Sequence, residues 1–164
     1  MTEPRIVIFG YGNTLRGDDA LGRVVADRLA AENLDDRVRI LSETMLTPEL
    51  ACHLSAATLV IFVDAACEGP VGEIVCRNAS EVPAGGPPVL HSFGPRGLLE
   101  LARQLSGNSP PAYLVSARGR SFEVADCRLS PELEALVVPM MTRVRELVGR
   151  HFAEWPRDRS RGSA

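Results

Sequence analysis

The sequence predicts a single α/β domain, a three-layer sandwich in which a twisted, mostly parallel five-stranded sheet with one antiparallel strand carries helices on both faces. Apolar runs of strand length alternate along the chain with stretches whose apolar residues recur every three to four positions. Such alternation requires crossover connections and is typical of sheets covered on both sides. With 164 residues, the chain is long enough to bury a core of this kind as one domain.

The first half of the chain supplies three strands and two helices. Residues 6–9 are an apolar run, and residues 21–29 have the i, i+3, i+4 spacing of an amphipathic helix. Residues 37–41 alternate between polar and apolar side chains, which predicts a second strand. Thr47 and the proline after it predict a short helix that ends near residue 54. The third strand is predicted over the continuous apolar run 58–63, which is typical of a central parallel strand buried on both faces.

The second half begins with a short strand over 73–77, expected at an antiparallel edge. A loop rich in glycine and proline follows over 83–88, and a helix with a leucine stripe is predicted over 97–105. Residues 112–116 form the fifth predicted strand, and residues 118–128 form a polar loop.

The last helix is predicted to open at Ser130-Pro131-Glu132, and Pro139 is expected to kink or restart it. We expect the domain to extend over residues 1–154. Residues 155–164 are polar and rich in arginine, and they are expected to form a disordered tail.

Composition excludes several functional classes. No apolar run approaches the ~20 residues of a membrane span, and the net charge of −3 gives no electrostatic case for a nucleic-acid partner. The N-terminus lacks a signal-peptide pattern, so we expect a cytoplasmic protein without membrane insertion. All 18 basic residues are arginine, which excludes a lysine base or Schiff base. None of the four cysteines forms a C-x-x-C pair, and we expect free thiols.

The turn between the first strand and the first helix is rich in glycine, asparagine and aspartate, namely Gly10, Gly12, Asn13, Asp18 and Asp19. Two carboxylates at this position can hold a cation or polarise a water molecule. The glycines do not form a dinucleotide fingerprint, because Leu15 stands at the third glycine position, and a phosphate loop would need a lysine. Two interpretations of the pair stay open: a tight turn in which Asp18 caps the helix, or a functional site.

Two separate carboxylates come together if the first and third strands are neighbours and the second lies on the far side of the first. The strand order then reverses between them, and ligands bind outside the carboxyl ends of strands at such a point. Asp19 follows the first strand and Asp64 ends the third, so both would flank this crevice. An aspartate after an apolar run is poorly explained by packing, although a local turn contact stays open. His91 lies in a loop before a helix and is either a ligand or a surface residue.

The opening turn resembles the signature of the hydrogenase maturation proteases, the endopeptidases that trim the large subunit of nickel-iron hydrogenases. The match comprises Gly10, Gly12, Asn13, Leu15, Asp18, Asp19 and Gly22. Residues 46–50 with 60–65, His91 with 98–102, and 129–132 resemble the family's later blocks, so the likeness covers most of residues 5–150. The departures are Ala20, where the family often has glycine, and residues 94–97, which replace a more leucine-rich spacing.

The resemblance implies a twisted sheet with helices on both faces and a nickel site formed by Asp19, Asp64 and His91, which would also be the catalytic residues. It implies that nickel arrives inside the substrate, a hydrogenase large-subunit precursor, and serves as the recognition element. Two carboxylates and one imidazole suit nickel, zinc, manganese or cobalt, so zinc or cadmium would occupy the site in vitro.

We therefore expect an endopeptidase that removes the C-terminal extension of the large subunit after nickel insertion. No covalent intermediate is expected, because the chain has no G-x-S-x-G elbow and no evident Cys–His pair. Two alternatives stay open: a non-catalytic, nickel-dependent checkpoint or chaperone for immature hydrogenase, and a stand-alone metallohydrolase.

Overall fold

The computed structural model describes residues 3–83, 93–124 and 127–156. Its centre is a five-stranded sheet in which the strands lie in the order β2-β1-β3-β5-β4. The strands are β1 (Ile6–Tyr11), β2 (Val38–Glu43), β3 (Leu59–Ala66), β4 (Ile74–Asn78) and β5 (Ala112–Arg118). Every neighbouring pair is parallel except β4 with β5, so the predicted antiparallel edge strand is confirmed.

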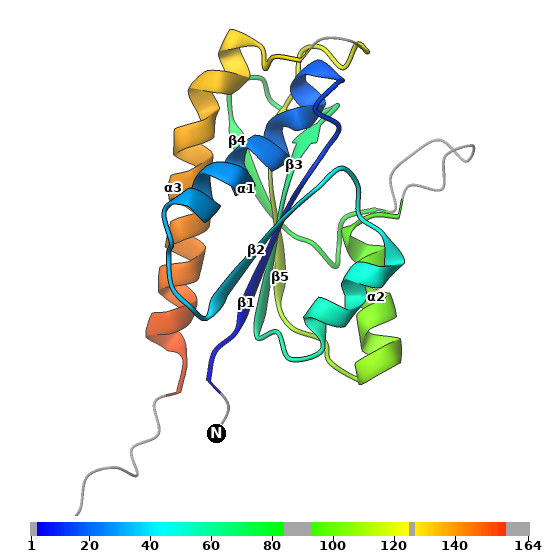
Figure 1. Cartoon of the computed structure of the whole chain (residues 1–164), viewed down its shortest axis with the longest axis vertical. Coiled ribbons are helices and arrows are strands. Elements are labelled where there is room, and N and C mark those ends of the chain that lie inside the picture. The colour runs from blue at the N-terminus through cyan, green and yellow to red at the C-terminus, as the bar shows by residue number, and fades with distance from the viewer. Residues whose placement is uncertain (1–2, 84–92, 125–126, 157–164) are drawn as a thin grey trace, which may run out of the picture.

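Helices cover both faces of this sheet (Figure 1), which confirms the predicted α/β sandwich. One face carries α1 (Leu21–Ala31) and α3 (Pro131–Glu154). The other carries α2 (Pro95–Ser106) and the 3-10 segment η2 (Pro48–Leu54). A second 3-10 segment, η1 (Gly17–Ala20), leads directly into α1. None of the helices in the described part of the chain is long and apolar enough to cross a lipid bilayer.

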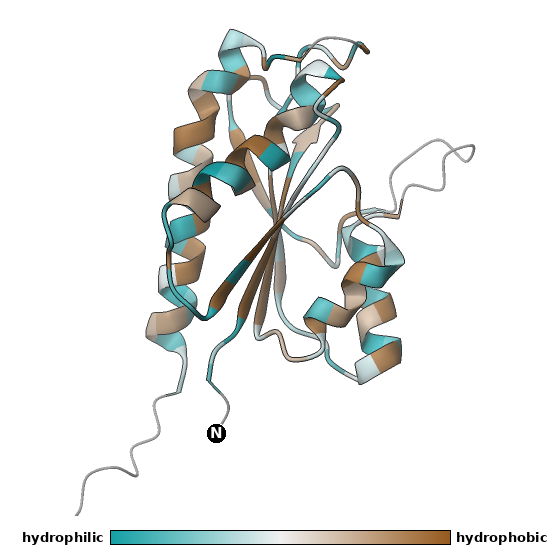
Figure 2. Ribbon diagram, viewed as in Figure 1, coloured by the Kyte–Doolittle hydropathy of each residue, from teal (hydrophilic) through white to brown (hydrophobic). Residues whose placement is uncertain are grey.

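The two central strands are buried on both sides because their side chains alternate between two cores. Figure 2 shows these strands as mostly apolar, whereas the helices around them are mixed. Toward α1 and α3 the strands present Ile6, Ile8, Leu59 and Ile61. Toward η2 and α2 they present Val7, Phe9, Val60 and Phe62.

The strand order reverses between β1 and β3, which meets the condition under which Asp19 and Asp64 flank one crevice. The chain leaves β1 through α1 and pairs β2 on one side, and it then returns through η2 to pair β3 on the other side. In sheets of this kind a crevice opens at the reversal, beyond the carboxyl ends of the two strands. The residues that follow β1 and β3 therefore flank this crevice.

Of the two outcomes expected at Pro139, the restart is wrong, because α3 runs through Pro139 as one 24-residue helix. Val137 and Met140, on either side of the proline, are fully buried, and this packing offsets the backbone hydrogen bond that a proline removes. Leu105, expected on the apolar stripe of α2, is 70% exposed, because Leu98 and Ala102 form the buried face. Of the expected tail, residues 157–164 lie outside the described residues.

Glycines allow α1 to lie against the backbone of the two central strands. A Cβ atom on Gly10 would lie 2.1 Å from the carbonyl oxygen of Gly22, in the first turn of α1. A Cβ atom on Gly22 would lie 2.2 Å from the carbonyl oxygen of Val63 and 2.4 Å from that of Tyr11. Neither contact leaves room for a side chain, so these glycines set the distance between the helix and the sheet.

We predict that Gly22→Ala destabilises the fold by about 2–3 kcal/mol, because the added methyl group must push α1 away from two backbone carbonyls. The matched control is Gly149→Ala on the exposed face of α3, where an added Cβ meets nothing within 4 Å. Its effect should be neutral or stabilising by up to about 1 kcal/mol, because alanine favours the helix. Urea unfolding of both variants measures the difference, and equal stabilities would contradict the packing role of Gly22.

Candidate active site

The two strands that flank the reversal change from apolar to polar side chains at the same level. Phe9 on β1 pairs in register with Phe62 on β3, and their rings stack with centroids 5.5 Å apart. Side chains on one face of a strand recur every second residue. Two residues further on, Tyr11 and Asp64 therefore lie side by side on the same face as the phenylalanines, at the carboxyl edge of the sheet.

Asp64 is a partly buried carboxylate held by two donors. Its Oδ1 accepts a hydrogen bond from the backbone N–H of Ala65 at 2.7 Å, and the side chain of Tyr11 donates a second hydrogen bond. Burial raises the pKa of Asp64 to about 7, and the negative charge of Asp19 adds to this effect, whereas the two hydrogen bonds oppose it. Burial likewise raises the pKa of Tyr11 well above its ordinary value, as do the charges of Asp64 and Asp19.

Asp19 is held on the other side of the crevice by the opening turn. Its Oδ2 accepts a hydrogen bond from the backbone N–H of Asn13 at 2.7 Å, and the Oδ1 of Asn13 accepts one from Leu15 at 2.9 Å. Gly12 has a φ of 147°, and a Cβ there would lie 1.7 Å from the carbonyl oxygen of Asp19. The glycine and asparagine of the motif thus fold the turn tightly against η1 and fix the backbone that carries Asp19.

Asp19 and Asp64 line the same open pocket, which has a volume of about 600 Å³. Tyr11, Asn13 and Arg16 join them on the polar side. The remaining wall is mainly apolar and consists largely of the connection from β2 into η2, with Met45, Leu46, Pro48 and Phe93. The pocket therefore combines two interacting carboxylates with an apolar surface beside them.

The third predicted site residue, His91, lies outside the described residues. Within the described ranges, no group of three or more His, Cys, Asp and Glu side chains could hold a metal ion. Neither of the other two histidines lines the pocket: His53 lies on η2, and His151 contacts the hydroxyl of Thr58 at 2.9 Å near the end of α3. The four cysteines are free thiols, as expected.

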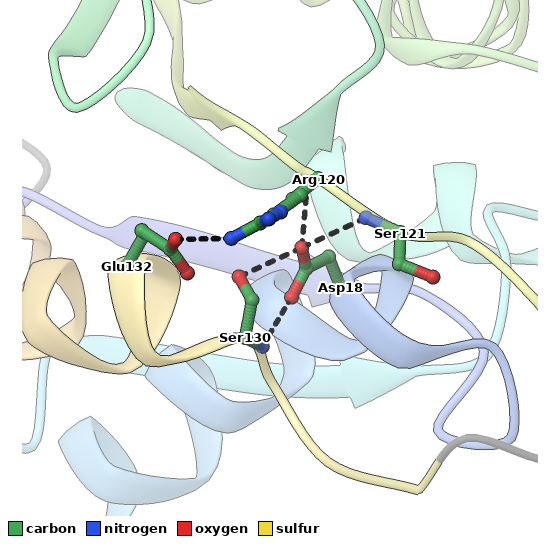
Figure 3. Close-up of polar contacts among 5 residues, drawn as sticks. All are labelled: Asp18, Arg120, Ser121, Ser130 and Glu132. Atoms are coloured by element: carbon green, nitrogen blue, oxygen red, sulfur yellow. Dashed lines mark hydrogen bonds and ion pairs between the residues drawn. The ribbon is translucent and has the colours of Figure 1, made fainter.

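Asp18, next to Asp19, has a different environment. It is fully buried, and η1 has no side-chain cap, so the helix-cap interpretation is wrong. Its carboxylate accepts hydrogen bonds from the backbone N–H groups of Arg120 (2.6 Å), Ser121 (3.1 Å) and Ser130 (2.6 Å), and from the hydroxyl of Ser130 (2.9 Å). Figure 3 shows these donors converging on Asp18, with the Arg120–Glu132 ion pair beside them.

These contacts tie the connection between β5 and α3 to the opening turn. The backbone N–H of Asp18 also donates to the carbonyl oxygen of Ser121 at 2.8 Å, so the attachment runs in both directions. Burial alone would raise the pKa of Asp18, but the hydrogen bonds from Ser130, Arg120 and Ser121 outweigh it, and the pKa lies below its ordinary value. Asp18 is therefore an ionised structural residue, while its neighbour Asp19 faces the pocket.

Sequence reasoning missed Tyr11 and the partners of Asp18. The signal for Tyr11 was available: it stands two residues after Phe9, as Asp64 stands two residues after Phe62, and strands one and three were expected to be neighbours. The partners of Asp18 had no such signal, because they lie more than 100 residues further along the chain, in a segment without periodicity.

Comparison with solved structures places the fold among hydrogenase maturation proteases. The hydrogenase-maturating endopeptidase HybD of E. coli is 26% identical, with 89% of this chain and 93% of that chain covered and a TM-score of 0.77. The maturation protease HycI of Thermococcus kodakarensis is 25% identical (92% and 93% covered, TM-score 0.69). The hydrogenase 2 maturation peptidase of a Thaumarchaeota archaeon is 29% identical (88% and 98% covered, TM-score 0.64). Models of protein families and curated protein sequences give no match.

We predict that Asp18→Asn destabilises the fold by about 3 kcal/mol, because an amide cannot accept all four hydrogen bonds and turns a donor toward donors. Since the folded pKa of Asp18 lies below the unfolded value of about 3.9, this contribution is present above that pH and is lost as the pH falls through the folded pKa. The stability gap between wild type and variant, measured by denaturant unfolding, should therefore close in strong acid. Asp27→Asn on the exposed face of α1 is the control, and an equal effect at both positions would contradict this role.

Proposed function

We propose that this chain, which belongs to the family of nickel-iron hydrogenase maturation proteases, is the endopeptidase that removes the C-terminal extension of a hydrogenase large subunit after nickel has been inserted. The observation that supports this function is the pocket at the strand reversal, where Asp19 and Asp64 meet beside an apolar wall. The likeness to endopeptidases of this class supports the proposed reaction, and the lining of the pocket supports the choice of the residues that would perform it.

The residues fit a divalent cation of the first transition series. Two carboxylates offer oxygen ligands, and the imidazole of His91 would be the third ligand. Burial and the charge of Asp19 raise the pKa of Asp64, so a cation between the two carboxylates would offset an existing electrostatic cost. In the proposed reaction this cation is the nickel of the substrate, which marks a precursor ready for cleavage. Bound there, nickel would act as a Lewis acid toward the peptide or water.

Peptide hydrolysis also needs a group that moves protons near neutral pH. The Asp64 carboxylate would accept a proton from the attacking water and return it to the leaving amine. Asp19 would hold the cation. The apolar wall with Met45, Leu46 and Pro48 would bind the part of the peptide chain next to the scissile bond. A peptide bound against this wall would exclude bulk water from the pocket.

The alternatives differ in outcome when the purified chain is mixed with a precursor. Shortening of the precursor only when nickel is present supports the proposed endopeptidase. Binding without shortening would favour the checkpoint or chaperone, and cleavage of unrelated peptides with added metal would favour a stand-alone metallohydrolase. Mass spectrometry of the precursor distinguishes the three.

We predict that Asp19→Asn, Asp64→Asn and His91→Ala each reduce processing of a nickel-loaded precursor by at least about a hundredfold, because each removes a ligand or the proton acceptor. Circular dichroism should show folded proteins, since none of these side chains is expected to stabilise the fold through packing. His53→Ala is the matched control and should process normally. Full activity in any of the three variants would remove that residue from the site.

We predict that the isolated chain binds cadmium weakly and that its affinity falls as the pH falls through about 7. The proton competes with the metal for Asp64 over this range, because its pKa is raised to about 7. A histidine ligand with an ordinary pKa near 6.5 would add to the same decline. Isothermal titration between pH 5.5 and 8.5 measures this dependence. Protein purified with one tightly held zinc ion per chain would contradict the idea that the metal arrives with the substrate.

A further inference from the structure

We infer that Tyr11 is a positioning residue, whose hydroxyl holds the carboxylate of Asp64 in the orientation in which it binds the metal of the substrate. This inference rests on the proposed function, because it assumes that Asp64 is a metal ligand. Tyr11 is not among the motif residues on which the resemblance depends. It stands between Gly10 and Gly12, at the position that the Gly-x-Gly-Asn pattern leaves open, and the structure places it beside Asp64.

The contact follows from the register of the sheet. Gly10 on β1 lies opposite Val63 on β3, so the next residues along the two parallel strands, Tyr11 and Asp64, are in-register neighbours on one face. The Tyr11 side chain packs against the buried cluster that contains Phe9 and Phe62, and Tyr11 also lines the pocket. A tyrosine has only two side-chain torsions, so packing of the ring fixes where the hydroxyl points.

Two donors from different strands then define the plane of the Asp64 carboxylate. The N–H of Ala65 belongs to the strand that carries Asp64 and holds Oδ1 at 2.7 Å. Tyr11 donates from the neighbouring strand, so the carboxylate is held from both strands. Partners of this kind orient metal ligands in many proteins, and their loss typically costs ten- to a hundredfold in metal affinity.

The test uses the full chain and cadmium as the probe, with affinity measured by isothermal titration at pH 8.5, where Asp64 is mainly ionised. Tyr11→Phe removes only the hydroxyl and should weaken cadmium binding by about tenfold. The matched control is Tyr113→Phe, which removes the only other tyrosine hydroxyl, on β5. It should leave affinity unchanged, and both variants should unfold at the wild-type denaturant concentration. Unchanged affinity in Tyr11→Phe, or loss of its fold, would overturn the inference and leave Tyr11 a packing residue.

A double-mutant cycle separates positioning from a general effect on the pocket. If Tyr11 acts through Asp64, its hydroxyl has no side-chain acceptor to orient in Asp64→Ala, and the tenfold loss should disappear in that background when weak binding is followed by NMR at millimolar cadmium. A loss that persists in Asp64→Ala would overturn the inference. Because the readout is metal affinity, it remains decisive even for a chain that cleaves no precursor. Absence of precursor cleavage with intact Tyr11–Asp64 coupling would reject only the proposed function.

Discussion

The parallel, in-register pairing of β1 with β3 is the constraint on which the rest of the structure depends. It places Phe9 against Phe62 in the core and, one step further along the same face, Tyr11 against Asp64 at the carboxyl edge. Gly10 and Gly22 allow α1 to lie directly on these two strands, so that the turn carrying Asp19 is held beside them. Strand pairing and helix packing thus bring the two carboxylates of the pocket together, and the connection from β2 into η2 supplies its apolar wall.

The three aspartates around this edge show how environment sets the role of a carboxylate. Asp18 is fully buried, but four hydrogen bonds satisfy it and lower its pKa, so it behaves as a charged anchor between the opening turn and the connection after β5. Burial and the like charge of Asp19 raise the pKa of Asp64 to about 7, although two hydrogen bonds oppose the rise. Asp19 faces the pocket between them. Structural and reactive carboxylates can therefore stand next to each other in the sequence when their hydrogen-bond donors differ.

The sequence predicted the features that depend on local pattern. Strand periodicity and glycine turns were enough to predict the sheet and its antiparallel edge. Long-range partners could not be predicted in this way. The cap preference of an aspartate before a helix suggested a local role for Asp18, whereas its donors come from residues 120–130. Pro139 was expected to kink or restart α3, and the restart does not occur, because local propensity carries no information about the burial that holds Val137 and Met140.

The central claim is that Asp19 and Asp64 act with His91 as one cation site in the crevice between β1 and β3. A crystal of the isolated chain soaked in cadmium tests it most directly, because the anomalous signal of the ion locates it without reference to any mechanism. The account predicts one ion that contacts Asp19, Asp64 and His91, with water in the remaining positions and Tyr11 still bonded to Asp64. An ion bound instead at His53 or His151, with the crevice left empty, would contradict it.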